Sequence, residues 1–300
     1  MRITVKGAAS FRVQGQRPYQ EDNRWPDSDS IAPSESTFIV CDGVGGAEHG
    51  EAASSAVAET IGSSMRQYGS DSNFGTAELG IQLGKGYAAL DRTADDIGST
   101  NMGTTLAFLH LGADGAMMAH IGDSRVYHYR PGAGFMYRSD DHSLVNSLVH
   151  TGNISPEQGV DHPRSNVITR CMSPGAANRC DATVVTATDV ADGDLFFLCS
   201  DGVLHCISDT GLAEMFESPR TIEVMMERLG KACTRSSDNS TAILVRIGQV
   251  SGVADRECDD AGAGPTRLLD IPMPRAEEIS PAQVRQRQSL FSRISNIFKS

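Results

Sequence analysis

Four aspartates in this sequence stand where short apolar runs end, each beside glycine or another small residue. They are Asp42, Asp123, Asp201 and Asp238. A carboxylate at the end of a strand is held in a fixed direction, and a following glycine, as in Asp42-Gly43, leaves the backbone carbonyl accessible. If several such groups converge, they form an oxygen-only site, which suits Mg²⁺ or Mn²⁺ better than zinc.

A second group of candidate residues lies near the N-terminus, where Arg17 precedes the acidic pair Glu21-Asp22. An arginine fork beside carboxylate-held metal ions fits recognition of a phosphoryl group. Each motif alone has an ordinary explanation, because Asp-Gly is most often a turn and an isolated charged residue usually lies at the surface. The hypothesis of a site therefore depends on the ordered combination.

The elements that would position these residues are short β-branched strands and two long amphipathic helices. Strands are predicted at 37–41, 104–111, 117–121, 125–129, 182–186, 195–199 and 241–247, and helices at 51–68, 78–97, 210–216 and 221–235. Residues 112–115 predict a hairpin turn. Two adjacent helices followed by hairpin-linked strands do not fit a βαβ repeat, and they favour a layered structure with largely antiparallel sheets.

The composition indicates a globular, acidic protein. The chain has 300 residues, 39% of them hydrophobic, and a net charge of −12. Nucleic acid binding needs clustered Lys and Arg, so this charge argues against it and against a metal-dependent nuclease. The seven cysteines include no C-x-x-C pair, and no apolar run is long enough to span a bilayer. We therefore expect a cytoplasmic protein without a disulfide framework or zinc site.

The character of the chain changes after residue 248. Residues 249–280 are rich in Gly, Pro, Asp and Glu and are predicted to form a flexible linker. Residues 281–300 predict a basic amphipathic helix, with Leu290, Phe291 and Ile294 on its apolar face. Such a helix could rest on an anionic membrane surface or a partner. Equally, it could pack on its own acidic domain or remain disordered, and the sequence leaves these alternatives open.

Seven short motifs occur in a fixed order between about residue 10 and residue 247. They are Arg17-x-x-x-Glu21-Asp22, Asp42-Gly43-x-Gly45-Gly46, Met102-Gly103-Thr104-Thr105, Gly122-Asp123-Ser124-Arg125, Asp140-Asp141-His142, Ser200-Asp201-Gly202 and Asp238-Asn239. This order resembles the metal-dependent Ser/Thr phosphatases of the protein phosphatase 2C or PPM family, in its bacterial form. The resemblance implies an α+β fold for residues 1–248, a four-layer α/β/β/α sandwich of two antiparallel β-sheets flanked by helices.

The resemblance also implies a metal cluster at one end of that sandwich. Asp42 would bridge two Mn²⁺ or Mg²⁺ ions, and the Gly43 carbonyl would be a ligand. Asp201 and Asp238 would complete the shell of the first ion. Some bacterial members carry a third, weaker metal ion, which in this chain would be held by Asp123 with Asp201.

The remaining roles implied by the resemblance concern the second ion and the substrate. Glu21 and Asp22 would hold the second ion, largely through water, and Arg17 would bind the substrate phosphate. The stretch 139–170 matches the variable flap of the family.

The implied reaction is hydrolysis of phospho-Ser/Thr in proteins by a hydroxide that bridges the two metal ions. Many eukaryotic members have a histidine after Asp-Gly as the proposed general acid, whereas in this chain Val44 occupies that place and cannot donate a proton. The rival hypothesis is a catalytically inactive relative that only binds phosphoproteins or partners. The expected partners are phosphorylated proteins and a cognate Ser/Thr kinase, and the family is mostly monomeric.

Overall fold

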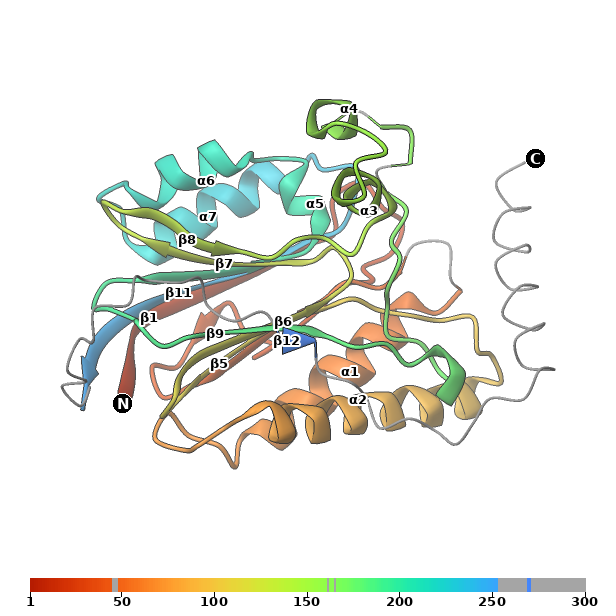
Figure 1. The fold of residues 1–300 in the computed structure, drawn as a ribbon, viewed down its shortest axis with the longest axis horizontal. Helices are drawn as coiled ribbons and strands as arrows, with labels where there is room; N and C mark the ends of the chain where they lie inside the picture. Colours follow the sequence, from red (N-terminus) through yellow and green to blue (C-terminus); the bar gives the residue numbers. More distant parts are fainter. Residues whose placement is uncertain (45–47, 161, 165, 253–268, 271–300) are drawn as a thin grey trace.

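Two β-sheets packed face to face, with helices on both outer faces, form the molecule (Figure 1). This computed structural model describes residues 1–44, 48–160, 162–164, 166–252 and 269–270. The first sheet has the strand order β3-β1-β11-β10-β7-β8 and the second has the order β12-β9-β6-β5-β4-β2. All neighbouring strands in both sheets are antiparallel. The predicted four-layer α+β sandwich is confirmed.

Within the described residues, each sheet has six strands. The first sheet contains β1 (Arg2–Val13), β3 (Ser30–Ile31), β7 (Arg125–Arg130), β8 (Gly134–Arg138), β10 (Leu195–Cys199) and β11 (Ser240–Ser251). The second contains β2 (Asn23–Trp25), β4 (Thr37–Cys41), β5 (Leu106–Gly112), β6 (Gly115–Ile121), β9 (Thr183–Ala187) and β12 (Leu269–Asp270). The helices are α1 (Gly50–Met65), α2 (Thr76–Ile97), α3 (Leu144–His150), α4 (Pro156–Val160), α5 (Asp201–Leu204), α6 (Asp209–Phe216) and α7 (Ile222–Cys233), with a 3₁₀ turn η1 (Ala176–Asn178).

Three apolar layers hold the sandwich together, and β4 shows how the sequence builds two of them. Successive side chains of a strand point to opposite faces. Phe38 and Val40 therefore pack in the core between the sheets, whereas Ile39 and Cys41 pack against α1 and α2. The third layer lies between the first sheet and helices α6 and α7. A strand covered on both faces reads as a continuous apolar run, which is why β4 could be predicted.

Strands in both sheets differ from the sequence prediction. Strand β1 was not predicted, because its middle, Ala8-Ala9-Ser10, lacks the β-branched residues that mark a strand. It pairs with β11 from Arg2↔Ser251 to Val13↔Ser240, and this long pairing carries β11 three residues into the predicted linker. Leu269–Asp270, also within that linker, form β12 and pair with β9.

Further differences concern short elements, the flap and the C-terminus. The strands β2, β3 and β8, the helix α5 and the turn η1 were also not predicted. The stretch 139–170 contains two short helices, α3 and α4, which the sequence analysis did not predict. The predicted hairpin turn at 112–115 joins β5 to β6. The predicted C-terminal helix, 281–300, lies outside the described residues. Within the described ranges, none of the helices combines the length and apolar character needed to cross a membrane.

Candidate active site

The four strand-end aspartates come from both sheets and lie at the same end of the sandwich. Asp42 follows β4, Asp123 lies in the turn from β6 to β7, Asp201 begins α5 directly after β10, and Asp238 precedes β11. The pKa of Asp42 is raised well above its ordinary value, first by burial and then by the charges of Asp22, Asp201 and Asp123. The side chains are therefore close enough to act on one another.

Asp42 is held in place by its own backbone. Its N–H donates to Thr105 Oγ1 at 3.0 Å, and its carbonyl accepts from Thr104 Oγ1 at 3.0 Å and from the Thr105 N–H at 2.9 Å. The next residue, Gly43, has no room for a side chain, since a Cβ there would lie 2.6 Å from the Gly50 carbonyl and 2.7 Å from the Glu21 carbonyl. The backbone at Asp42-Gly43 is therefore fixed, and residue 43 must be glycine.

Asp201 lies close to Asp42, and their interaction raises the pKa of Asp42 while it opposes the rise in the pKa of Asp201. The pKa of Asp201 is raised, first by burial and then by the charge of Asp238, while the nearby His205 opposes the shift. The next residue, Gly202, packs so closely on the chain before β11 that a Cβ would lie 1.9 Å from the Asn239 carbonyl oxygen. This contact joins the segments that carry Asp201 and Asp238.

Two further carboxyl groups have raised pKa values because they are buried. Asp22 is fully buried, and burial raises its pKa to about 7 although Ser200 Oγ donates to its Oδ2 at 2.7 Å. Burial, and next the charge of Asp201, raises the pKa of Asp123 to about 7. The pKa of Glu21 is also raised by burial, against the influence of Arg17.

Arg17 forms the one ion pair that links the N-terminal motif to the strand-end aspartates within the described ranges. Its Nη2 donates to Asp238 Oδ2 at 2.7 Å, and this bond is the main reason that the pKa of Arg17 is raised. The two side chains are 38% and 24% exposed. The structure thus places Arg17 at the rim of the acidic cluster, open to solvent.

The donor set fits a divalent metal centre by chemistry. The candidate side-chain ligands, Glu21, Asp22, Asp42, Asp123, Asp201 and Asp238, are all carboxylates, and hard cations prefer oxygen. Asp22 Oδ1 is buried and has no hydrogen-bond partner among the described residues. As these side chains stand, no three His, Cys, Asp or Glu of the described ranges are arranged to hold an ion.

Asn239, whose role was not predicted from the sequence, holds the N-terminal loop at this site. Its side chain is almost fully buried; Oδ1 accepts from the Glu21 N–H at 2.8 Å, and Nδ2 donates to the carbonyls of Gln14 at 2.8 Å and Tyr19 at 2.9 Å. Asn239 thus fastens the loop that carries Arg17 and Glu21 beside Asp238. The sequence shows Asn239 within the Asp238-Asn239 motif, but its hydrogen-bond partners lie more than 200 residues away, so its role could not be predicted.

The flap is anchored beside Asp123 by the Asp140-Asp141-His142 motif. Arg125 donates two hydrogen bonds to Asp141, at 2.6 and 2.7 Å, and the Gly122 N–H donates to His142 Nδ1 at 3.2 Å. Burial, with smaller contributions from His120 and Arg170, lowers the pKa of His142 to about 3. His142 is therefore a neutral acceptor in a structural contact.

Comparison with known proteins gives the same family as the sequence motifs. The sequence model of the family described as protein phosphatase 2C matches residues 21–243, well over half of the chain. The serine/threonine phosphatase stp of Listeria monocytogenes is 28% identical over 217 residues, which cover 69% of this chain and 82% of that protein.

Solved structures show the same fold. Stp1, a serine/threonine phosphatase of Staphylococcus aureus, superposes with a TM-score of 0.68 at 25% identity, covering 84% of this chain and 98% of that chain. The catalytic domain of the serine/threonine protein phosphatase PstP in complex with two manganese ions gives a TM-score of 0.63 at 25% identity, covering 82% of this chain and all of that chain. Phosphatases of this family depend on metal ions. The chain belongs to the protein phosphatase 2C family and is a serine/threonine protein phosphatase.

Proposed function

We propose that the acidic cluster at the end of the sandwich binds two Mn²⁺ or Mg²⁺ ions and hydrolyses phosphoserine and phosphothreonine in proteins. The observation that carries this proposal is the mutual electrostatic influence of Asp42, Asp22, Asp201 and Asp123, which come from different strands and both sheets. So many carboxyl groups at close range are unfavourable unless cations neutralise them. A third ion would be held by Asp123 with Asp201.

The roles of the residues follow from where they lie. When bound, the cations supply a hydroxide nucleophile at neutral pH and neutralise charge on the phosphoryl group. Asp42, fixed by Thr104 and Thr105, would bridge the ions, with the Gly43 carbonyl beside it. Asp201 and Asp238 would complete the coordination of one ion.

Arg17 is proposed to bind and orient the substrate phosphate. It uses one of its five N–H groups on Asp238, and the partly exposed guanidinium keeps further donors for phosphoryl oxygens. A planar guanidinium matches the geometry of phosphate oxygens, so it both positions the group and stabilises charge that develops on it. Glu21 and Asp22, on the same loop, would hold the second ion through water.

Two aspartate variants test this proposal. Hydrolysis of a phosphothreonine peptide and of an aryl phosphate is measured with Mn²⁺, with Mg²⁺ and with a chelator. Asp42→Asn and Asp201→Asn should lose at least a hundredfold in kcat/KM, because each removes a charge from the centre of the cluster. Asp114→Asn, at an exposed hairpin position, is the matched control and should keep full activity.

The alternative, an inactive relative that only binds phosphoproteins, gives a different result in the same assay. It would bind the phosphopeptide without turnover in either metal ion, and the aspartate variants would equal the unaltered chain. All six of the candidate acids are present, which favours the active enzyme. We also propose that a Ser/Thr kinase acts on the same proteins, since a phosphatase of this class needs phosphorylated substrates, and that the enzyme acts as a monomer in the cytoplasm.

A further inference from the structure

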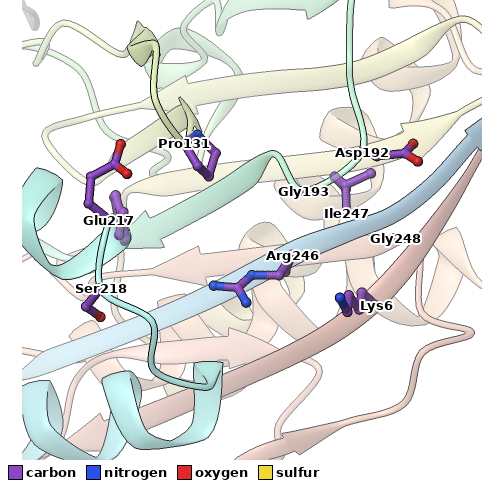
Figure 2. A pocket seen from close by; sticks show the side chains of 10 residues that line it. Lys6, Pro131, Asp192, Gly193, Glu217, Ser218, Arg246, Ile247 and Gly248 are labelled. Carbon is purple, nitrogen blue, oxygen red and sulfur yellow. The ribbon is translucent and has the colours of Figure 1, made fainter.

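A pocket of about 510 Å³ lies at the other end of the first sheet, away from the acidic cluster (Figure 2). It is formed where α6 ends and β10 begins, over the outer face of β1 and β11. Its lining includes two cations, Lys6 and Arg246, and two acids, Asp192 and Glu217.

Two cations line this pocket because of local features of the two strands. Along β11, the apolar residues Ala242 and Leu244 pack under the helices, and Arg246 follows them on the same face. In β1, the register with β11 shifts between Val5 and Gly7, so that Lys6 is the extra residue of a β-bulge. A bulge redirects a side chain, and Lys6 consequently lines the same pocket as Arg246.

Neither cation is neutralised by an ion pair. Among the described residues, no acid lies within ion-pair distance of Lys6 or Arg246. The charge of Arg246 acts on Glu223, at the start of α7. The pKa of Glu223 is lowered first by hydrogen bonds with its own N–H and with Thr221, and Arg246 is a smaller cause than either.

The two acids of the pocket are engaged elsewhere. Glu217 Oε1 accepts from the Gly132 N–H and from Tyr129 Oη, both at 2.8 Å, and Asp192 Oδ1 accepts from the Val250 N–H at 2.8 Å. Figure 2 shows both carboxylates directed away from the Arg246 guanidinium. In a chain with a net charge of −12, the pocket therefore combines two uncommitted cations with space for a ligand.

We propose that this pocket is a second anion site, which binds a phosphate group. An ammonium group and a guanidinium group both donate charge-assisted hydrogen bonds to phosphate oxygens. The phosphate could belong to a second phosphorylated residue of a protein substrate or be free in solution. Asp238 and Arg246 are eight residues apart along one extended segment, about 26 Å at about 3.3 Å per residue. A substrate phosphorylated at two places could therefore reach both sites.

The first arm of the test measures phosphate binding without the catalytic centre. The full chain is treated with a chelator, and its thermal unfolding is followed as inorganic phosphate is added in the millimolar range, with chloride at matched ionic strength as reference. Phosphate should stabilise the unaltered chain. The double variant Lys6→Gln/Arg246→Gln should lose this response, whereas Arg92→Gln, which removes an exposed cation from α2 on the opposite layer, should keep it.

The second arm identifies the source of the phosphate, and it rests on the proposed function. Peptides with one phosphothreonine, or with two separated by ten to fourteen residues, are compared as substrates. The doubly phosphorylated peptide should have a KM lower by about fivefold in the unaltered chain, and the double variant should show no preference. Turnover of an aryl phosphate should be the same in both, which shows that the variant is folded.

The outcomes are distinct. If phosphate stabilises the unaltered chain but the two peptides have equal KM values, the site exists and takes free phosphate. If the double variant equals the unaltered chain in both arms, the inference is wrong. If no peptide is hydrolysed by the unaltered chain, the proposed function fails, while the first arm still decides on the pocket.

Discussion

Replacing Asn239 by alanine should damage both stability and catalysis, although this side chain touches neither substrate nor metal in the proposed mechanism. The change removes three hydrogen bonds, from the Glu21 N–H and to the carbonyls of Gln14 and Tyr19. At about 1 kcal/mol of net stability for each bond, the free energy of unfolding should fall by about 3 kcal/mol. Urea unfolding of the metal-free protein measures this value directly.

The catalytic effect follows from the loop that Asn239 fastens. Without it, Arg17 and Glu21 lose their fixed distance from Asp238, and groups that orient metal ligands typically contribute tenfold to a hundredfold in affinity or activity. We expect the Mn²⁺ concentration for half-maximal activity to rise at least tenfold, measured with a phosphothreonine peptide. Gln16→Ala is the matched control, since its exposed side chain makes one long bond, 3.3 Å, to the Arg235 carbonyl in the same region.

The reasoning is refuted if Asn239→Ala unfolds within about 0.5 kcal/mol of the unaltered chain, the range of an ordinary surface substitution. Equal Mn²⁺ dependence in the two proteins would refute the functional half alone. Asn239→Asp separates the two contributions, because it keeps the acceptor for the Glu21 N–H but loses both donated bonds.

Three further predictions concern stability. Gly202→Ala should destabilise the fold by more than about 2 kcal/mol in urea unfolding, because its Cβ would lie 1.9 Å from the Asn239 carbonyl oxygen. Burial alone would raise the pKa of Asp194, but hydrogen bonds from Arg130 and His128 hold this pKa below its ordinary value. The stability that the Asp194 carboxylate contributes to the fold is therefore complete above about pH 4 and is lost as the pH falls further. Asp194→Asn should therefore flatten the acid limb of a plot of unfolding free energy against pH. Finally, Mn²⁺ at a hundredfold excess over its Kd should raise Tm by about 5–10 °C, chelator should reverse the shift, and an unchanged Tm would contradict a metal centre in the acidic cluster.

The sequence predicted the parts of the fold that have strong local signals. Strand β4 and helix α2 were found because a continuous apolar run and a 3.6-residue apolar period are unambiguous. Strand β1 was not found, because its Ala8-Ala9-Ser10 centre carries no local preference and the strand is stabilised by its pairing with β11, more than 220 residues away. Tertiary pairing of this kind leaves no trace in a short window of sequence.

The candidate site shows the same division between local and distant signals. The strand-end aspartates could be identified one by one, since each stands in a short motif with glycine or serine. The ion pair of Arg17 with Asp238 and the bracing bonds of Asn239 could not be predicted, because they join segments about 220 residues apart. Residue types indicated the chemistry, and only the fold shows which segments hold the residues in place.

The acidic cluster also explains why metal binding and folding should be linked in this protein. Burial raises the pKa of Asp22 and Asp123 to about 7, and it also raises the pKa values of Asp42 and Asp201. Without cations, deprotonation of these carboxyl groups at neutral pH therefore lowers the stability of the fold. A carboxyl group with a raised pKa stabilises the fold most below its ordinary pKa, and this stabilisation is lost as the pH rises. A divalent cation would displace these protons and reverse the cost. The metal-free protein should accordingly become less stable as the pH rises through 7, whereas the Mn²⁺-bound protein should not.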